Sequence, residues 1–218
     1  MNFCATENYF CMLNIAVFAS GKGSNFKAIL DAIDNGRIPN ARIVIVISNN
    51  SDAGALAIGR GYGIPSLHIS RKNFESDNLY TAAIQKALSH HGANFIVLAG
   101  YMKKIDPSIV RAYRHRILNI HPALLPSFGG KGMYGIHVHE AVLAAKQKQS
   151  GATVHLVDEE YDRGPIVLQK RVNITDNDTP ESLATKVLEI EYQLYPEAIR
   201  LFAEGSIRID DHDRVSIS

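Results

Sequence analysis

The segment Leu13-Asn-Ile-Ala-Val-Phe-Ala-Ser-Gly-Lys-Gly-Ser-Asn-Phe26 reads as a strand, a glycine-rich turn and the start of a helix. Its first seven residues are mostly apolar, as in a parallel strand that is buried on both faces. The apolar positions that follow have helical spacing: Phe26, Ile29, Leu30 and Ile33. Unpaired amides and a positive dipole at the helix start make this turn a candidate site for one phosphate. The alternative is an ordinary tight turn in which Ser24 or Asn25 caps the helix.

The next hundred residues repeat this alternation. Apolar runs predict strands, and amphipathic patterns predict helices between them. The predicted strands are 42–48, 66–69, 95–99 and 117–121, and the predicted helices are 53–61, 78–90 and 107–113. Strands that alternate with helices form parallel βαβ units. We therefore expect an α/β fold: a Rossmann-like, open, mostly parallel twisted sheet with helices on both faces.

The C-terminal half predicts an antiparallel addition to this sheet. Strands at 152–157 and 166–172 flank an acidic loop at 158–164, which favours a hairpin. A long helix over 181–204 is expected to begin at Thr179-Pro180 and to bend or break at Pro196. The chain then divides into an N-terminal extension, 1–12, one domain, 13–205, and a C-terminal tail or hairpin, 206–218.

Composition limits the classes of function. The chain has 218 residues, of which 46% are hydrophobic and 21% charged, which is typical of a globular protein. A formal net charge of +1 predicts no nucleic-acid or anionic-membrane partner. The only cysteines, Cys4 and Cys11, indicate no disulfide framework and favour a cytoplasmic protein. No apolar run approaches the ~20 residues that cross a bilayer.

The stretch Arg116-Ile-Leu-Asn-Ile-His-Pro-Ala-Leu-Leu-Pro126 is the strongest candidate for a functional site. Alternation along a strand places Asn119 and His121 on one face, and Pro122 ends the strand. Ligands of open α/β sheets bind at such carboxyl ends. The alternative is a strand end with two polar residues turned to solvent.

Two other features remain open at this point. The loop at 127–135 holds four glycines, so it either comes close to a bound ligand or is a long loop exposed to solvent. A helix is predicted over 136–147, with His137 and His139 near its start. Because these histidines are two apart, we expect surface or capping residues rather than metal ligands.

Several separated motifs resemble the phosphoribosylglycinamide formyltransferase family, in its order and with similar spacing from about Leu13 to Gly205. They are Ala19–Asn25, Leu98–Met102, Asn119–Pro126, Gly151–His155, Asp162–Ile166, and Glu191 ahead of Tyr195-Pro196. The sequence also departs from the family. Lys103 stands where arginine is common, and Asp77 or Asn78 lies where some members have a folate-contacting arginine. The loop Gly129–Gly135 is longer than in the short-loop members.

The resemblance implies an enzyme of purine (IMP) biosynthesis. Its co-substrate would be 10-formyltetrahydrofolate, whose formyl group passes to the amine of 5-phosphoribosylglycinamide (glycinamide ribonucleotide). Asn119 and His121 are implied to stabilise the oxyanion of the tetrahedral intermediate. Asp162 is implied to raise the pKa of His121 and so keep it protonated. His121 is also implied as a donor of a proton to the departing folate nitrogen.

The resemblance also implies binding residues. Those for the phosphate and ribose of the acceptor are Gly23, Ser24, Asn25 and Glu191. Those for the folate are Met102, Lys103, Lys104, Ile105, Asn119, Asp158 and Asp162. The alternatives are that Met102 is a core residue and that Glu191 is an exposed helix residue. No metal is implied, and the sequence contains no evident ligand set for one.

Three rival functions stay open. A methionyl-tRNA formyltransferase would need a C-terminal tRNA-binding domain and more basic charge. A formyltetrahydrofolate hydrolase would carry an extra N-terminal domain. A non-catalytic small-molecule-binding protein would not be expected to retain Asn119, His121 and Asp162 together. The expected partners are the two small-molecule substrates, and the expected assembly is a monomer or homodimer.

Overall fold

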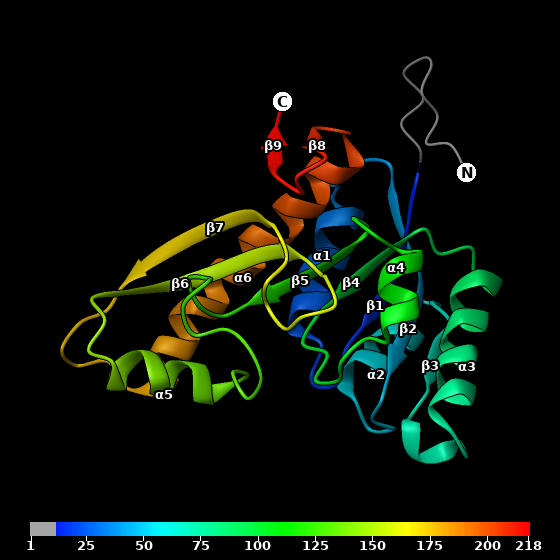
Figure 1. The fold of residues 1–218 in the computed structure, drawn as a ribbon, viewed down its shortest axis with the longest axis horizontal. Helices are drawn as coiled ribbons and strands as arrows, with labels where there is room; N and C mark the ends of the chain where they lie inside the picture. Colours follow the sequence, from blue (N-terminus) through cyan, green and yellow to red (C-terminus); the bar gives the residue numbers. More distant parts are fainter. Residues whose placement is uncertain (1–11) are drawn as a thin grey trace.

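A computed structural model describes residues 12–218 of the chain. Its centre is a seven-stranded sheet with the strand order β3-β2-β1-β4-β5-β6-β7 (Figure 1). The first five strands are parallel, and β6 and β7 are antiparallel additions at one edge. The seven strands are β1 (Leu13–Phe18), β2 (Ala41–Ser48), β3 (Ser66–His68), β4 (Phe95–Leu98), β5 (Ile117–His121), β6 (Gln149–Leu156) and β7 (Ile166–Asn173).

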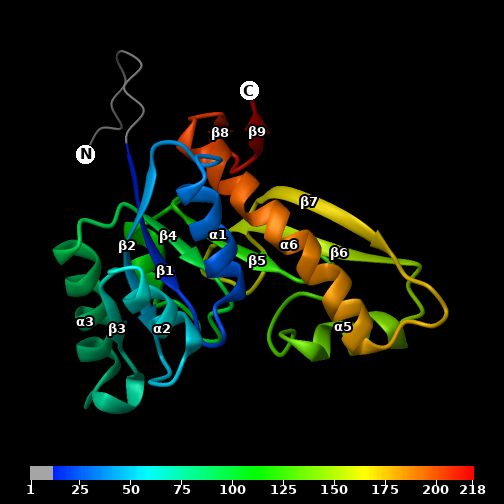
Figure 2. The ribbon, with the colours of Figure 1, turned by 180° about the vertical axis from the view of Figure 1, so that it is seen from behind.

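Helices cover both faces of this sheet (Figures 1 and 2). One apolar cluster joins the sheet to α1, α2, α5 and α6, and a second cluster joins the opposite face to α3 and α4. Alternation along β1 divides its side chains between the clusters, with Ile15 and Val17 in the first and Ala16 and Phe18 in the second. The helices are α1 (Ser24–Asp34), α2 (Gly54–Gly61), α3 (Asp77–His90), α4 (Pro107–Ala112), α5 (Ile136–Ala144) and α6 (Pro180–Ala203), with a 3-10 turn at Arg71–Asn73.

The predicted fold class is confirmed, including the antiparallel addition. The predicted C-terminal hairpin is also present, as β8 (Ile207–Ile209) paired with β9 (Val215–Ile217). The predicted N-terminal extension, with Cys4 and Cys11, lies outside the described residues except for Met12. No helix between residues 12 and 218 is long and apolar enough to cross a membrane.

Some predicted boundaries differ from the structure. Pro196 was expected to bend or break the last helix, and the break is wrong, because α6 runs without interruption from Pro180 to Ala203. An internal proline costs roughly 3 kcal/mol, and the burial of its neighbours outweighs that cost: Tyr195, Ala198 and Ile199 are all 0% exposed. The helix predicted to reach Gln147 ends at Ala144, and β6 begins at Gln149 instead of Ala152, because pairing with β7 extends the strand.

The order in which strands are added to the sheet switches between β1 and β4. Strands β2 and β3 lie on one side of β1, and β4 and the later strands lie on the other. Such a switch point leaves a crevice outside the carboxyl ends of the strands. The buried Tyr195 of α6 fixes this region, since its hydroxyl lies 3.0 Å from the Leu98 carbonyl oxygen and 2.9 Å from that of Leu118. The helix thus holds the ends of β4 and β5 beside the crevice.

Candidate active site

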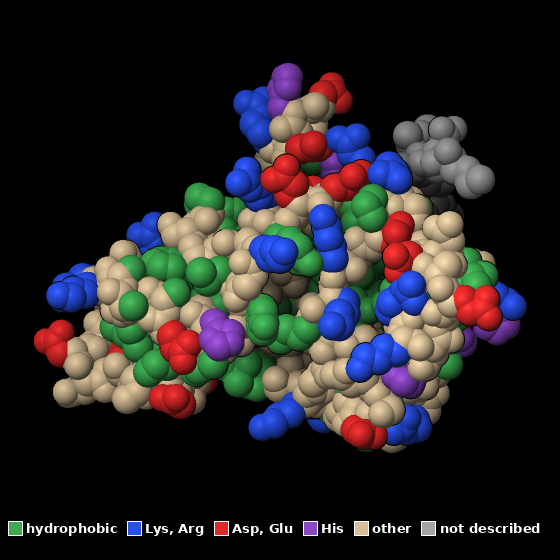
Figure 3. Space-filling view, turned by 60° about the horizontal axis from the view of Figure 1, so that its bottom comes forward, with side chains coloured by type: hydrophobic (Ala, Val, Ile, Leu, Met, Phe, Trp, Pro, Cys, Tyr) green, Lys and Arg blue, Asp and Glu red, His purple; other side chains and the backbone are tan. Residues whose placement is uncertain are grey.

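A cavity of about 540 Å³ opens at the carboxyl ends of β4 and β5. Its walls are the loop after β4, the end of β5, the glycine-rich loop before α5, the acidic loop after β6 and one side of α6. In the view toward this end of the molecule, hydrophobic side chains gather over the part that carries α5, and Lys and Arg side chains are spaced across the rest (Figure 3). The cavity lies where the alternation of β5 predicted a ligand.

His121 is held at the end of β5 by the turn that follows it. The side chain is buried, and its Nε2 lies 2.7 Å from the Phe128 carbonyl oxygen. A carbonyl only accepts, so Nε2 carries the hydrogen of this bond. Nδ1 faces Asp162, with 3.6 Å between Nδ1 and Oδ2. This is the nitrogen that remains for chemistry in the cavity.

Asn119 is oriented by His155, its antiparallel partner on β6. His155 Nδ1 lies 2.8 Å from the Leu156 carbonyl oxygen and therefore donates to it. In that tautomer Nε2 is an acceptor, and it receives a hydrogen bond from the Asn119 amide nitrogen at 3.1 Å. These two hydrogen bonds, from Asn119 to His155 and from His155 to Leu156, orient the Asn119 side-chain amide with its nitrogen toward His155.

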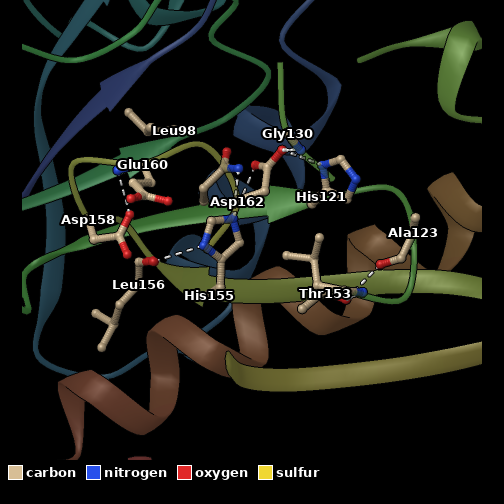
Figure 4. A network of polar contacts seen from close by, with 12 residues as sticks. Leu98, His121, Ala123, Gly130, Thr153, His155, Leu156, Asp158, Glu160 and Asp162 are labelled. Atoms are coloured by element: carbon tan, nitrogen blue, oxygen red, sulfur yellow. Dashed lines mark hydrogen bonds and ion pairs between the residues drawn. The ribbon is translucent and has the colours of Figure 1, made fainter. Parts of the chain in front are cut away.

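Asp162 lies between the two buried histidines (Figure 4). Its Oδ2 accepts a hydrogen bond from the Gly130 N–H at 2.8 Å, and its Oδ1 lies 3.6 Å from His155 Nε2. The backbone of Asp162 is left-handed, with φ 55°, which is uncommon outside glycine and occurs at functional sites. A Cβ on Gly129 would lie 3.0 Å from Asp162 Cβ, so glycine is needed for the two loops to meet.

The charges of this group differ from the prediction for His121. Burial lowers the pKa of His121, and Asp162 and the Phe128 carbonyl offset only part of that effect. The expectation that Asp162 raises this pKa enough to keep the ring protonated was therefore wrong for the unliganded protein. Burial alone would raise the pKa of Asp162, but His155, His121 and the Gly130 N–H together bring it below its usual value. The resting site is a carboxylate beside the buried His121, whose lowered pKa favours the neutral ring.

Glu191 and Asn25 form a second polar group in the wall of the same cavity, where α1 meets α6. The Asn25 amide nitrogen donates to Glu191 Oε2 at 2.6 Å. Burial raises the pKa of Glu191 to about 7, although this hydrogen bond opposes the shift. Glu191 is 7% exposed, so the alternative of an exposed helix residue is wrong.

The turn before α1 places these side chains. Gly23 precedes α1 with φ 82°, and a Cβ there would lie 2.8 Å from Ala55 Cα, so this close packing requires glycine. Asn25 lines the cavity, whereas Gly23 and Ser24 are not part of its wall. No hydrogen bond from the Ser24 or Asn25 side chain caps the helix.

All seven residues predicted for the folate line the cavity. They are Met102, Lys103, Lys104, Ile105 and Asp158, with Asn119 and Asp162 of the reaction group. Met102 is 51% exposed, so the alternative of a core residue is wrong, and its N–H donates to the Ser20 hydroxyl at 2.8 Å. Lys104 lies over the ring of Tyr161, 5.3 Å from its centroid, which joins this side of the cavity to the acidic loop.

Sequence reasoning missed two histidines of the cavity. His155 falls within the predicted strand 152–157 and was given no role, although its hydrogen bond with Asn119 makes it part of the polar network. His139 was expected at the surface or in a cap, but it is 4% exposed and lines the cavity. His137 does lie at the surface, where it pairs with Glu140 at 3.0 Å. Within the described range, no cluster of three or more His, Cys, Asp or Glu is placed to hold a metal ion.

Residues 13–199 match the formyl transferase family. This chain belongs to that family. It is 45% identical over 195 residues to "Phosphoribosylglycinamide formyltransferase, chloroplastic" of Arabidopsis thaliana, covering 89% of this chain and 66% of the plant protein. It is 40% identical over 201 residues to "Phosphoribosylglycinamide formyltransferase" of Haemophilus influenzae, covering 92% of each.

Solved structures agree with this membership. The glycinamide ribonucleotide transformylase 1 structure from Symbiobacterium toebii superposes with a TM-score of 0.88 at 40% identity, covering 98% of this chain and 99% of that one. The formyl transferase fold therefore accounts for nearly the whole described chain. The matched region spans about two thirds of the plant relative.

Proposed function

We propose that this protein transfers the formyl group of 10-formyltetrahydrofolate to the amine of 5-phosphoribosylglycinamide. The products are the formylglycinamide ribonucleotide and tetrahydrofolate, a step of de novo purine biosynthesis. Family membership and the names of both relatives support this reaction. The folate is a co-substrate, and the chemistry proposed below uses protein side chains alone.

One observation carries the proposal: a single cavity contains the reaction group together with two sets of candidate binding residues. Asn119, His121 and Asp162 meet at the strand ends, with the Asn25–Glu191 pair on one wall and residues 102–105 with Asp158 on another. We propose that the first wall binds the acceptor, with Glu191 at the ribose and Asn25 at the phosphate, which would also reach Gly23 and Ser24 of the adjoining turn. The second wall would bind the folate.

The arrangement suits formyl transfer. The acceptor amine attacks the formyl carbon, a carbon–nitrogen bond forms, and one electron pair moves to the formyl oxygen. Asn119 has a second amide N–H beyond the one that His155 receives, and this donor would stabilise the oxyanion. Removing one such donor costs roughly 3 kcal/mol in other enzymes.

The resting charges define the role of the other two residues. Neutral His121 would take the proton of the attacking amine at Nδ1 and pass it to the folate nitrogen as the bond to the formyl carbon breaks. The nearby carboxylate of Asp162 stabilises the imidazolium that exists between the two transfers. His121 therefore needs to be charged only during the reaction.

A spectroscopic folate assay tests the proposal. We expect tetrahydrofolate to form only when both 10-formyltetrahydrofolate and glycinamide ribonucleotide are present. Folate turnover without the amine would favour a hydrolase, and turnover with methionyl-tRNA would favour the tRNA formyltransferase. Binding of both substrates without turnover would favour a non-catalytic protein.

We also propose how the protein exists in the cell. A cytoplasmic location fits its cysteine content, with Cys4 and Cys11 as the only two. The partners would be the two small-molecule substrates and neither nucleic acid nor membrane, given the net charge of +1. The assembly would be a monomer or a homodimer, which light scattering of the purified protein distinguishes.

A further inference from the structure

His139 has an unused hydrogen-bonding atom beside the cavity. It lies on the first turn of α5, which begins at Ile136, and it is 4% exposed. Its Nδ1 is buried and has no hydrogen-bond partner among residues 12–218. A buried polar atom without a partner lowers stability, so such atoms are rare in folded proteins and call for an explanation.

A second such atom lies on the wall of the same cavity. Three buried side-chain atoms lack a partner in the described part of the chain: Asn25 Oδ1, His139 Nδ1 and Ser150 Oγ. Two of the three belong to residues that line the cavity, and Ser150 does not. Unmet hydrogen-bonding capacity is therefore concentrated where a ligand would supply the missing partners.

The position of α5 decides which ligand. Helix α5 packs against α6, and α6 contributes Ala184, Leu188 and Glu191 to the cavity wall. His139 and Glu191 thus line the same cavity from two helices that pack against each other. Burial and then the nearby His121 lower the pKa of His139, so its ring is neutral. A neutral imidazole offers one donor and one acceptor, and sugar hydroxyls and amides complement both.

We propose that His139 is a binding residue for the acceptor nucleotide and makes a hydrogen bond to the sugar–amide part of glycinamide ribonucleotide. The inference rests on the proposed function and adds to it a contact from α5. It also explains why a histidine occupies a nearly closed position between apolar residues: Val138 is 0% and Val142 is 1% exposed.

Calorimetric titration of the whole protein with glycinamide ribonucleotide, without folate, tests this contact. We expect His139→Leu to raise the acceptor Kd about tenfold, the loss expected for one hydrogen bond in a buried site. The Kd of 10-formyltetrahydrofolate is expected to change less than about twofold. Because the leucine removes an unpaired polar atom, the melting temperature of the unliganded variant is expected to equal or exceed that of wild type. His137→Leu, two residues away on the exposed side of the helix, is the matched control and leaves both affinities unchanged.

Two results overturn the contact while leaving the proposed function intact. One is acceptor binding by His139→Leu at wild-type affinity, and the other is equal weakening for both substrates. If His139→Leu melts well below wild type, the acceptor affinity and melting temperature of His139→Gln are measured as well, because the glutamine amide restores a donor and an acceptor. Recovery of acceptor affinity then supports the contact, and recovery of stability alone overturns it. Absence of acceptor binding by the wild-type protein overturns the proposed function and this contact together.

Discussion

Glu191→Gln is expected to stabilise the unliganded protein, and the size of the effect follows from burial. Glu191 is 7% exposed, and burial raises its pKa from 4.5 to about 7. A raised carboxyl pKa means that the folded protein holds a proton that the unfolded chain releases. The contribution to stability is full below about pH 4.5 and is lost as the pH rises to about 7. At 1.36 kcal/mol per pKa unit, the ionised side chain costs about 3 kcal/mol at pH 8.

Glutamine keeps the shape of this side chain and an oxygen that accepts from Asn25, but it carries no charge. Urea unfolding at about pH 8 is expected to give a free energy of unfolding 2–3 kcal/mol above wild type, with a difference below about 1 kcal/mol at pH 5. Glu189→Gln, on an exposed position of the same helix, is the control and is expected to change stability by less than about 0.5 kcal/mol at both pH values. A Glu191→Gln effect that is the same at both pH values would refute the burial argument. Acceptor affinity is expected to fall, because the carboxylate would no longer receive the ribose hydroxyls.

Three further changes test the reaction group and its supports. Asp162→Asn removes the charge that stabilises the His121 imidazolium, so kcat is expected to fall about 100-fold or more. The acidic limb of the pH–rate profile is expected to move to lower pH, because Asp162 raises the pKa of His121. An unchanged profile would contradict the assignment. Thr153→Val removes the hydroxyl that donates to the Ala123 carbonyl oxygen at 2.6 Å and accepts from the Leu125 N–H at 3.1 Å in the turn after β5. Denaturation is expected to show a free energy of unfolding lower by about 2 kcal/mol, and kinetics a lower kcat. Thr153→Ser is expected to restore both. Gly23→Ala forces a Cβ to 2.8 Å from the next helix at φ 82°, so the acceptor KM is expected to rise, whereas Gly21→Ala, with nothing within 4 Å of its Cβ, leaves it unchanged.

The fold was predictable because two signals agreed along most of the chain. The apolar run of β1 and the helical spacing of α1 each describe one element, and their alternation with later elements dictates parallel pairing. The boundaries that failed depend on partners far away in the sequence. The strand predicted to begin at Ala152 begins at Gln149, because residues such as Gly151 pair with β7. The helix that Pro196 was expected to bend or break is not broken, because packing around Tyr195 keeps α6 continuous.

The site was predictable where strand geometry alone placed a side chain. Asn119 and His121 follow from alternation on β5 and a proline after it. His139 did not, because the segment from Ile136 to His139 is apolar and polar in turn and gives no clear buried face for a helix. The charge of His121 was also out of reach. The family resemblance implies Asp162 as the partner of His121, but the burial that lowers the pKa of His121 exists only in the folded chain.

The two polar parts of the cavity differ in how completely their hydrogen bonds are satisfied. At the reaction group, Asn119 bonds to His155, His121 to the Phe128 carbonyl, and Asp162 to the Gly130 N–H. These side chains are held before any substrate arrives, which suits groups that must meet a developing charge.

The acceptor wall, which is formed by Asn25, His139 and Glu191, has hydrogen-bonding groups that are not satisfied in the unliganded protein. Asn25 Oδ1 and His139 Nδ1 lack partners, and the buried Glu191 is costly to ionise. A ligand that supplies these partners removes costs that the unliganded protein bears, in addition to the stabilisation that any ligand gives by mass action. Saturation with glycinamide ribonucleotide is therefore expected to lower the melting temperature difference between wild type and Glu191→Gln, because the acceptor relieves the strain only in the wild type. Folate at the same multiple of its Kd is expected to leave that difference unchanged, since the folate wall contains none of these groups. Equal effects of the two ligands would show that the unmet groups do not belong to the acceptor wall.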